Sequence, residues 1–180
     1  MHGFSVSANT LSMKKIIILM LVLVGMQLCA QNLTPASDVV GHYTYEHSFG
    51  YDYEGNHFEV SETGTMDFYP DGTALDSAQQ VYTVTLKEGK SVMWVYNYIS
   101  PSRWRVENSD FYFGGIKEQF RMEVIEGNEE LELAQKIVGL YQSGIDRETK
   151  YHLDSLTPTR LQWSLTYRDG HSDTWTFLRN

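Results

Sequence analysis

The chain has almost no cysteine, and this scarcity limits how its fold can be stabilised. Its 180 residues contain a single cysteine, Cys29, within the apolar N-terminal stretch. If export removes that stretch, no cysteine remains to form a disulfide bond or to act as a nucleophile. The exported domain would then depend on its hydrophobic core.

Positive charge is also scarce. The chain has 14 Lys+Arg against 23 Asp+Glu, a formal net charge of −9 at pH 7, and no basic tract. Because nucleic acids and anionic membranes bind basic surfaces, neither partner is expected. The apolar share of 42% and the charged share of 21% are those of a globular protein, which argues against disorder, a collagen helix or a coiled coil.

The motifs of common catalytic and metal sites are missing as well. The chain has no G-x-S-x-G element and no glycine-rich phosphate loop. His42 and His47 are five residues apart on one expected strand, so their side chains project to opposite faces and cannot share a metal ion. Asp52-x-Glu54-x-Asn56 lacks the glycine position of a calcium loop. We therefore expect no metal, no cofactor and no enzyme activity.

The N-terminus has the pattern of a secretory signal peptide. Lys14 and Lys15 precede an apolar run at 16–24, and the small residue Ala30 precedes Gln31. The run is shorter than the roughly 20 residues that a membrane-spanning helix needs. We expect cleavage between Ala30 and Gln31, export to the periplasm or the medium, and no membrane span afterwards.

Two further expectations concern this segment. Met13 directly precedes the two lysines and is expected to be the true start, with residues 1–12 as an extension. Cys29 offers a minor alternative, a lipoprotein anchor. The residue before it is Leu28, where lipoprotein processing requires a small residue.

Period-two alternation dominates residues 31–180. Odd positions from Tyr43 to Tyr53 are mostly aromatic and even positions are mostly polar, which predicts a strand with one apolar face. In the next strand Glu62 interrupts the apolar face and Gly64 leaves a gap, which predicts a bulge or a bend. A loop is expected up to Gln80, and further alternating strands follow.

The period changes once, after residue 128. Leu133, Ile137, Leu140 and Tyr141 are three or four residues apart, which predicts an amphipathic helix near 129–142. Asn128 is expected to cap its first turn.

These elements predict a single all-β domain over residues 31–180. Eight or nine antiparallel strands joined mostly by short turns suit an up-and-down barrel, with the helix packed against it. A two-sheet β-sandwich is the alternative.

Short stretches of the chain resemble the lipocalins. Gly41-His42-Tyr43 is similar to the Gly-x-Trp with which that family begins its first strand, and Arg179 stands where the family places an arginine that closes the barrel end. The segment 64–73 resembles the "G-T-x-x-F-x-x-D-G-T" hairpin of small lipocalin-like proteins exported by bacteria. The resemblance implies a barrel that holds a ligand or a partner. We expect Tyr43 and Arg179 to meet, with a cation–π contact of about 0.5–2 kcal/mol.

Aromatic residues are abundant: 12 Tyr, 8 Phe and 4 Trp. They can form a core alone, or a core with a cavity lined by rings. The second interpretation gives the candidate ligand-binding residues Tyr45, Trp94, Tyr96, Trp163 and Trp175. The leading hypothesis is an exported, non-enzymatic protein that binds a small, partly apolar ligand. The alternative is a protein-interaction or inhibitor module of the cell envelope with a filled barrel, and an interior cavity of roughly 300 Å³ or more would favour the first.

Overall fold

The structure is a computed structural model that describes residues 36–180 except 128 and 169. All of the described residues belong to one compact unit. The predicted signal peptide, its cleavage site and Cys29 lie outside the described residues. Within the described residues, no helix is long and apolar enough to cross a membrane.

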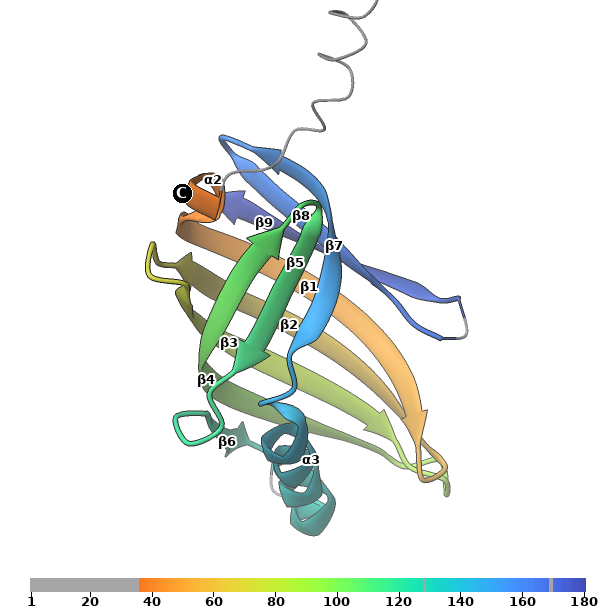
Figure 1. Cartoon of the computed structure of the whole chain (residues 1–180). Coiled ribbons are helices and arrows are strands. Elements are labelled where there is room, and N and C mark those ends of the chain that lie inside the picture. The colour runs from red at the N-terminus through yellow and green to blue at the C-terminus, as the bar shows by residue number, and fades with distance from the viewer. Residues whose placement is uncertain (1–35, 128, 169) are drawn as a thin grey trace, which may run out of the picture. The chain divides into compact units, whose positions relative to one another are not determined.

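Nine strands and two helices make up the described part of the chain (Figure 1). They are α2 (Ala36–Val39), β1 (Gly41–Tyr53), β2 (Asn56–Phe68), β3 (Thr73–Thr85), β4 (Ser91–Glu107), β5 (Asp110–Gly115), β6 (Arg121–Glu126), α3 (Leu131–Gly144), β7 (Thr149–Thr157), β8 (Arg160–Thr166) and β9 (Ser172–Arg179).

Eight of these strands form a closed antiparallel barrel. β1 to β5 pair in chain order, β5 pairs with β7, and β7, β8 and β9 lead back to β1. Because β9 pairs with β1 at residues 43–45 and so closes the sheet on itself, the barrel prediction is confirmed and the sandwich alternative is excluded. β6 is the extra strand and pairs with residues 95–99 of β4, whereas β5 pairs with residues 102–107 of the same strand.

Two local predictions are wrong. The residues before Gln80 are not a loop, because β3 begins at Thr73 and pairs without a break with β2 and β4. β2 contains no bulge either, since its register with β1 and β3 continues through Glu62 and Gly64. In both strands the residues on the inner face are polar or small at these positions, so the apolar alternation that marks a strand is lost.

The predicted helix exists, displaced by two residues to Leu131–Gly144. Its N-cap is Glu130, in the left-handed region with φ 51°, and no side chain among the described residues caps it. Asn128, the residue expected to cap the first turn, lies outside the described residues. Burial of Ala134, Ile137 and Val138 identifies the face that packs on the barrel end.

Tyr43 and Arg179 pair across the seam between β1 and β9. The guanidinium carbon of Arg179 lies 5.1 Å from the centre of the Tyr43 ring, and its Nε donates to the Tyr43 hydroxyl at 3.1 Å. That hydroxyl in turn donates to the Val39 carbonyl at 2.8 Å. The contact expected from the resemblance is thus present, and it is a hydrogen bond as well as a cation–π contact. It connects α2, the first strand and the last strand at one end of the barrel.

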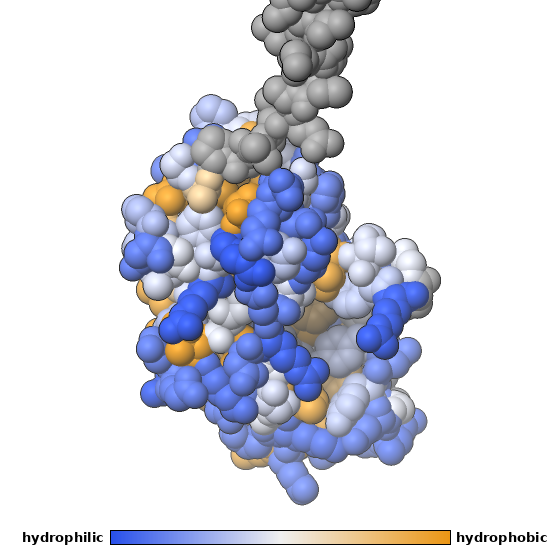
Figure 2. Space-filling view, in the orientation of Figure 1, coloured by the Kyte–Doolittle hydropathy of each residue, from blue (hydrophilic) through white to orange (hydrophobic). Residues whose placement is uncertain are grey.

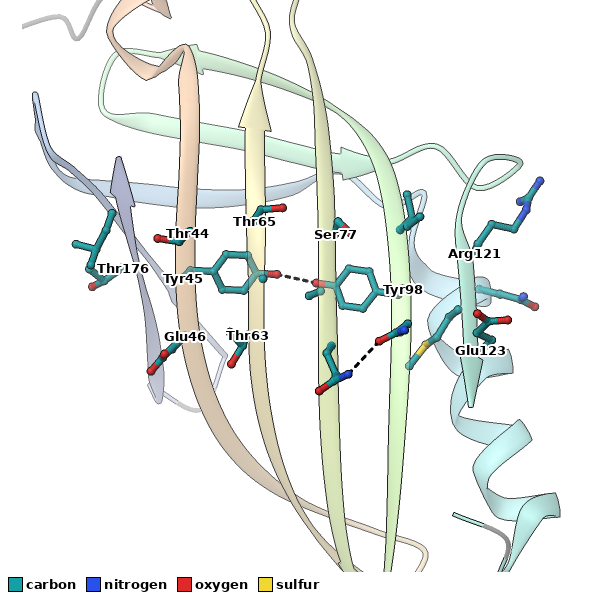
Figure 3. Close-up of a pocket in the computed structure, with 18 residues that line it drawn as sticks. Thr44, Tyr45, Glu46, Thr63, Thr65, Ser77, Tyr98, Arg121, Glu123 and Thr176 are labelled. Carbon is teal, nitrogen blue, oxygen red and sulfur yellow. Dashed lines mark hydrogen bonds between the residues drawn. The ribbon is translucent and has the colours of Figure 1, made fainter. Parts of the chain in front are cut away.

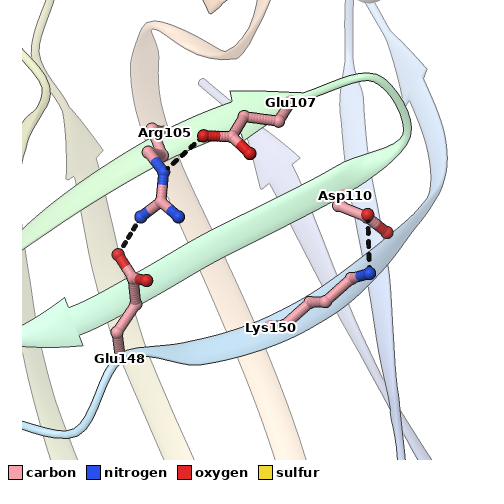
Figure 4. Close-up of polar contacts among 5 residues, drawn as sticks. All are labelled: Arg105, Glu107, Asp110, Glu148 and Lys150. Carbon is pink, nitrogen blue, oxygen red and sulfur yellow. Dashed lines mark hydrogen bonds and ion pairs between the residues drawn. The ribbon is translucent and has the colours of Figure 1, made fainter.

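On the outer face, ion pairs cross the short strand β5 (Figure 4). The Arg105 guanidinium of β4 binds Glu107 at 2.8 Å and also pairs with Glu148, just before β7. Lys150 of β7 pairs with Asp110 of β5 at 2.7 Å. These groups are exposed, so they add little to stability. They mark the strand order β4–β5–β7 on the surface.

Candidate functional site: an aromatic cavity with two carboxyl groups

An interior cavity of about 240 Å³ lies between the barrel walls. Aromatic side chains from β1, β5, β7, β8 and β9 form much of its lining: Phe49, Phe113, Tyr151, Trp163, Trp175 and Phe177. Tyr141 of helix α3 and Ile145, the residue that follows the helix, close part of it from the barrel end. The remaining space is therefore mostly walled by rings, with a small number of polar groups.

The cavity lies beside a place where the barrel wall is incomplete. Within the described residues, β1 and β9 pair over three positions, ending at Tyr45 and Phe177. Beyond that point the His47 ring packs at 4.8 Å from the Trp175 ring and at 5.6 Å from Phe49. Figure 2 shows a recess next to the β8–β9 hairpin with apolar surface inside it. Side chains, rather than backbone hydrogen bonds, thus fill the junction between these two strands.

The strand register brings two tyrosines together on the inner wall. Tyr45 of β1 lies opposite Gly64 of β2. Ala78 of β3 lies between Gly64 and Tyr98 of β4. The two tyrosines reach across the two small residues, and their hydroxyl oxygens are 2.9 Å apart.

Two carboxyl groups lie on either side of this tyrosine pair. Glu62 of β2 and Asp76 of β3 belong to the neighbouring inward-facing rows of the sheet. The Tyr45 hydroxyl is 2.7 Å from Glu62 Oε1 and 2.8 Å from Asp76 Oδ1. The Tyr98 hydroxyl is 2.5 Å from Glu62 Oε1 and 2.8 Å from Asp76 Oδ2. The four groups, which we name the Tyr–carboxyl cluster, therefore contact one another through their polar atoms.

Proton counting shows that this cluster is electrostatically costly. Each tyrosine hydroxyl donates one hydrogen bond, so the two can satisfy only part of the contacts if both carboxyl groups are ionised. Burial, with the nearby Glu62 carboxyl as a second cause, raises the pKa of Asp76 to about 7. Burial and the two carboxyl groups also raise the pKa of Tyr45 and that of Tyr98, so both hydroxyls keep their protons. Asp76 is the group of the cluster that titrates near neutral pH.

Gly64 makes the cluster possible. A Cβ atom at this position would lie 2.6 Å from the Ala78 Cβ and 2.8 Å from the Tyr45 hydroxyl oxygen. Real Cβ atoms do not approach that closely, so any side chain here would displace the tyrosine. What the sequence shows as a gap in an apolar face is space for the Tyr45 side chain.

Gln80 extends the polar wall toward helix α3. Its Nε2 donates to Glu62 Oε2 at 3.1 Å and to the Tyr141 hydroxyl at 3.2 Å. The side chain is only 2% exposed, and its Oε1 is buried without a hydrogen-bond partner among the described residues. The Nε2 of His47 is likewise buried and lacks a partner in this part of the chain. Buried acceptors without donors are unusual in folded proteins.

The structure separates the five candidate ligand-binding residues into two groups. Tyr45, Trp163 and Trp175 line the cavity. Trp94 and Tyr96 are fully buried outside its lining, under helix α3 and the segment that precedes it. Trp94 Nε1 donates to the Glu129 carbonyl, and the Tyr96 hydroxyl donates to the Ala134 carbonyl. The helix covers the part of the inner wall to which these rings belong.

The sequence interpretation also missed the polar residues of the cavity: Glu62, Asp76, Gln80 and Tyr98. The sequence does contain a signal for Glu62, because it lies at an even position of its strand, as the apolar residues Phe58, Val60 and Met66 do, and is therefore expected to face inward. A charged residue on the inner face of a strand costs free energy unless it has a function or a partner.

A larger hollow of about 1,290 Å³ lies on the outer face of the same strands (Figure 3). Thr44 and Glu46 flank Tyr45 on β1 and therefore point to the side opposite the barrel interior. Neighbouring strands contribute Thr65 and Gln79, whose Nε2 donates to Asn97 at 3.3 Å. This hollow has a mostly polar lining and shares Tyr45 and Tyr98 with the aromatic cavity.

Within the described residues, no three His, Cys, Asp or Glu side chains are grouped so that they could hold a metal ion. No protein-family model matches the chain, and no curated protein matches it. Functional assignment therefore depends on the geometry of the barrel.

Proposed function

We propose that this protein is an exported, non-enzymatic, lipocalin-like binding protein that holds a small, partly apolar molecule inside its barrel. The cavity of about 240 Å³ supports this proposal, because its rings offer apolar contact and its few polar groups can orient a ligand. The volume is below the roughly 300 Å³ at which size alone would favour a ligand-binding barrel, so the proposal rests on the mixed aromatic and polar lining of the cavity and not on its size. The ligand is therefore expected to be smaller than a drug, with one or two rings or a short chain.

The filled-barrel alternative, an interaction or inhibitor module of the cell envelope, receives less support. Rings fill one end of the barrel, where Phe68 contacts Phe111 at 5.6 Å and Trp163 at 6.0 Å. The filling stops at the cavity, where Trp163 is also part of the lining. A barrel built only as a rigid support for loops would gain stability by filling this space as well.

The neutral, polarity-sensitive naphthalene probe prodan tests ligand binding. We expect it to bind one-to-one, with a dissociation constant on the order of 100 µM or tighter. Trp175→Ala should weaken binding about tenfold, because the indole forms part of the cavity wall next to His47. Probe fluorescence titrations of the wild type and the variant give the two constants.

Tyr69→Ala is the matched control, since Tyr69 is an aromatic residue that is 43% exposed in a turn and does not line the cavity. Its affinity should equal that of the wild type. Saturable binding that is the same in all three proteins would place the probe elsewhere and contradict the proposal. Absence of any binding to a folded wild type would also contradict it.

Export is tested by the mature N-terminus. A chain that starts at Met13 and is expressed in a bacterial host should appear in the periplasm or the medium and begin at Gln31, in open or cyclised form. The reason is the basic, apolar and small-residue pattern that ends at Ala30. Mass spectrometry of the purified protein measures this.

Cys29→Ser distinguishes the two processing routes. Cleavage after Ala30 does not need the thiol, so the variant should be processed as the wild type is. A lipid on Cys29, or retention of residues 13–30, would disprove the proposed route.

A further inference from the structure

The polar groups of the cavity are unbalanced in charge. Glu62 and Asp76 line it, whereas no lysine or arginine does among its described lining residues. The imidazole of His47 interacts electrostatically with Glu62, but burial lowers the pKa of this imidazole and so disfavours its charged form. Buried carboxyl groups are normally paired with a cation. Here the protein supplies two tyrosine hydroxyls and an amide instead.

Gln80 is an independent observation that points to a missing donor. Its side chain is 98% buried and lines the cavity, and both Nε2 contacts are already made, to Glu62 and to Tyr141. Exchanging the oxygen and nitrogen would turn Oε1 toward the Glu62 carboxylate, so the amide orientation is determined. Its Oε1 therefore remains an acceptor without a donor among the described residues. A buried acceptor of this kind costs about 1–3 kcal/mol unless a ligand or a water molecule donates to it.

The opposite side of the cavity is aromatic. Trp163, Trp175 and Tyr151 contact one another edge-on or at a tilt, with ring centres 5.5–5.6 Å apart for the two Tyr151 pairs. The faces of such rings attract cations as well as hydrocarbon groups. The unsatisfied groups and the rings thus favour the same kind of ligand, one that carries positive charge and N–H donors.

We propose that the cavity is selective for a small organic ammonium compound, a primary amine attached to a ring or a short hydrocarbon group. The ammonium group donates to Glu62, Asp76 and Gln80 Oε1, and the hydrocarbon part lies among Trp163, Trp175 and Tyr151. An ammonium group has three N–H donors, and each carboxylate oxygen has two lone pairs, so these acceptors retain capacity beyond the tyrosine contacts. This inference deepens the proposed function and rests on it.

Protonation should modulate this selectivity. Asp76 faces Tyr45 of β1, Glu62 of β2, Tyr98 of β4 and, at longer range, Tyr141 of α3 and Tyr151 of β7. The tyrosines remain neutral because burial raises the pKa of each. Ionisation of Asp76 near pH 7 therefore adds a negative charge that the wall does not neutralise. As the pH rises, His47 also loses any remaining positive charge, and this too favours a bound cation. Amine affinity is expected to increase with pH across neutrality.

Three ligands of nearly equal size test the proposal on the wild-type protein: 2-phenylethylamine, 2-phenylethanol and phenylacetate. Calorimetric titration at pH 8 should show the amine binding at least tenfold more tightly than the alcohol, and no binding of the carboxylate. The amine stays protonated between pH 6 and 8, as a lysine side chain does. Over that interval its affinity should increase up to about tenfold, following the ionised fraction of Asp76.

Glu62→Gln should reduce amine affinity at least tenfold and reduce the affinity for the alcohol much less, so the preference for the amine should fall. Glu46→Gln is the matched control, because it removes one carboxylate from the outer face of the neighbouring strand and should change neither constant. Asp76→Asn should remove the part of the pH dependence that comes from Asp76 and leave only the smaller part that comes from His47. Because the ligand series is measured on the wild type, the test does not depend on a variant that folds poorly.

The outcomes separate this inference from the function on which it rests. If prodan and the alcohol bind but the amine binds no more tightly, the ammonium proposal is wrong and the binding function stands. If amine affinity falls equally in Glu46→Gln and Glu62→Gln, the attraction comes from the general negative charge of the protein, and the proposal is again overturned. If neither prodan nor any of the three ligands binds to the folded protein, both the function and the inference fail.

Discussion

The free energy of unfolding of the wild type is expected to fall by up to about 4 kcal/mol between pH 4 and pH 7 because of Asp76, and Asp76→Asn should abolish this fall. The ordinary pKa of an aspartate is 3.8, and burial raises that of Asp76 to about 7 in the folded protein. Across this interval the folded state holds a proton that the unfolded state has lost. Unfolding then releases a proton, so the free energy of unfolding falls as the pH rises, by about 1.36 kcal/mol for each unit of pKa difference.

The direction follows from the raised pKa. The stabilising contribution of the protonated carboxyl is complete below about pH 4 and is lost as the pH rises through 7, after which no further change is expected from this group. Asparagine cannot ionise, yet its amide can accept from one tyrosine hydroxyl and donate to the other. The variant should therefore keep the contacts to Tyr45 and Tyr98 and be more stable than the wild type at pH 8.

Urea unfolding followed by tryptophan fluorescence, at intervals from pH 4.5 to pH 8, measures the difference between the two proteins. Other titrating groups contribute equally to both curves and cancel. Asp146→Asn is the control, because Asp146 is exposed after helix α3, and its curve should run parallel to that of the wild type. Parallel curves for Asp76→Asn as well would show that Asp76 titrates normally and would disprove the account of the cluster.

The fold could be predicted from the sequence because most of the strands follow one rule. From Tyr43 to Tyr53 the side chains alternate between a mostly aromatic inner face and a polar outer face. In the segment 92–98 every second side chain is a buried apolar or aromatic residue, and both patterns place the strands in a barrel wall. The Tyr43–Arg179 contact could be anticipated because barrel closure makes the first and last strands neighbours. These predictions need only local periodicity and connectivity.

The site could not be predicted in the same way, because its residues break the rule. Glu62 and Asp76 face inward but are not apolar, so the alternating pattern breaks at both positions. The broken pattern predicts a bulge or a bend at Glu62 and a loop around Asp76. Their partners are 17 to 36 residues away, and which hydroxyl meets which carboxyl depends on a register that only the folded barrel defines. The same limit applies to Trp94 and Tyr96, whose parity is inward but whose surroundings depend on where α3 docks.

Trp94→Ala is expected to lower the free energy of unfolding by about 3–5 kcal/mol and to leave prodan affinity unchanged. Trp94 is fully buried, pairs with Tyr82 of β3, and donates from Nε1 to the Glu129 carbonyl at 2.8 Å. Truncation removes the ring on which the segment before α3 packs and leaves that carbonyl without its donor. Both losses affect stability in the helix-covered part of the wall, outside the cavity lining.

Gly127 shows how closely this segment is fitted to the indole. Its φ is 97°, and a Cβ there would lie 2.7 Å from Trp94 Cδ1 and 2.4 Å from the Met93 carbonyl oxygen. The chain therefore passes directly over the ring on its way into the helix. Trp94→Phe keeps most of the apolar contact and loses only the hydrogen bond, so its cost should be smaller, about 1–3 kcal/mol.

Comparison with Trp175→Ala makes this prediction decisive. Trp175 is only partly buried and lines the cavity, so its truncation should weaken prodan binding more than it lowers stability, whereas Trp94→Ala should do the reverse. Urea unfolding and probe titration on both variants measure the two effects. If Trp94→Ala is unfolded at 25 °C, Trp94→Phe provides the binding measurement. Loss of binding in a stable Trp94 variant would mean that the ligand occupies the helix-covered end, and the cavity around Glu62 and Asp76 would not be the binding site.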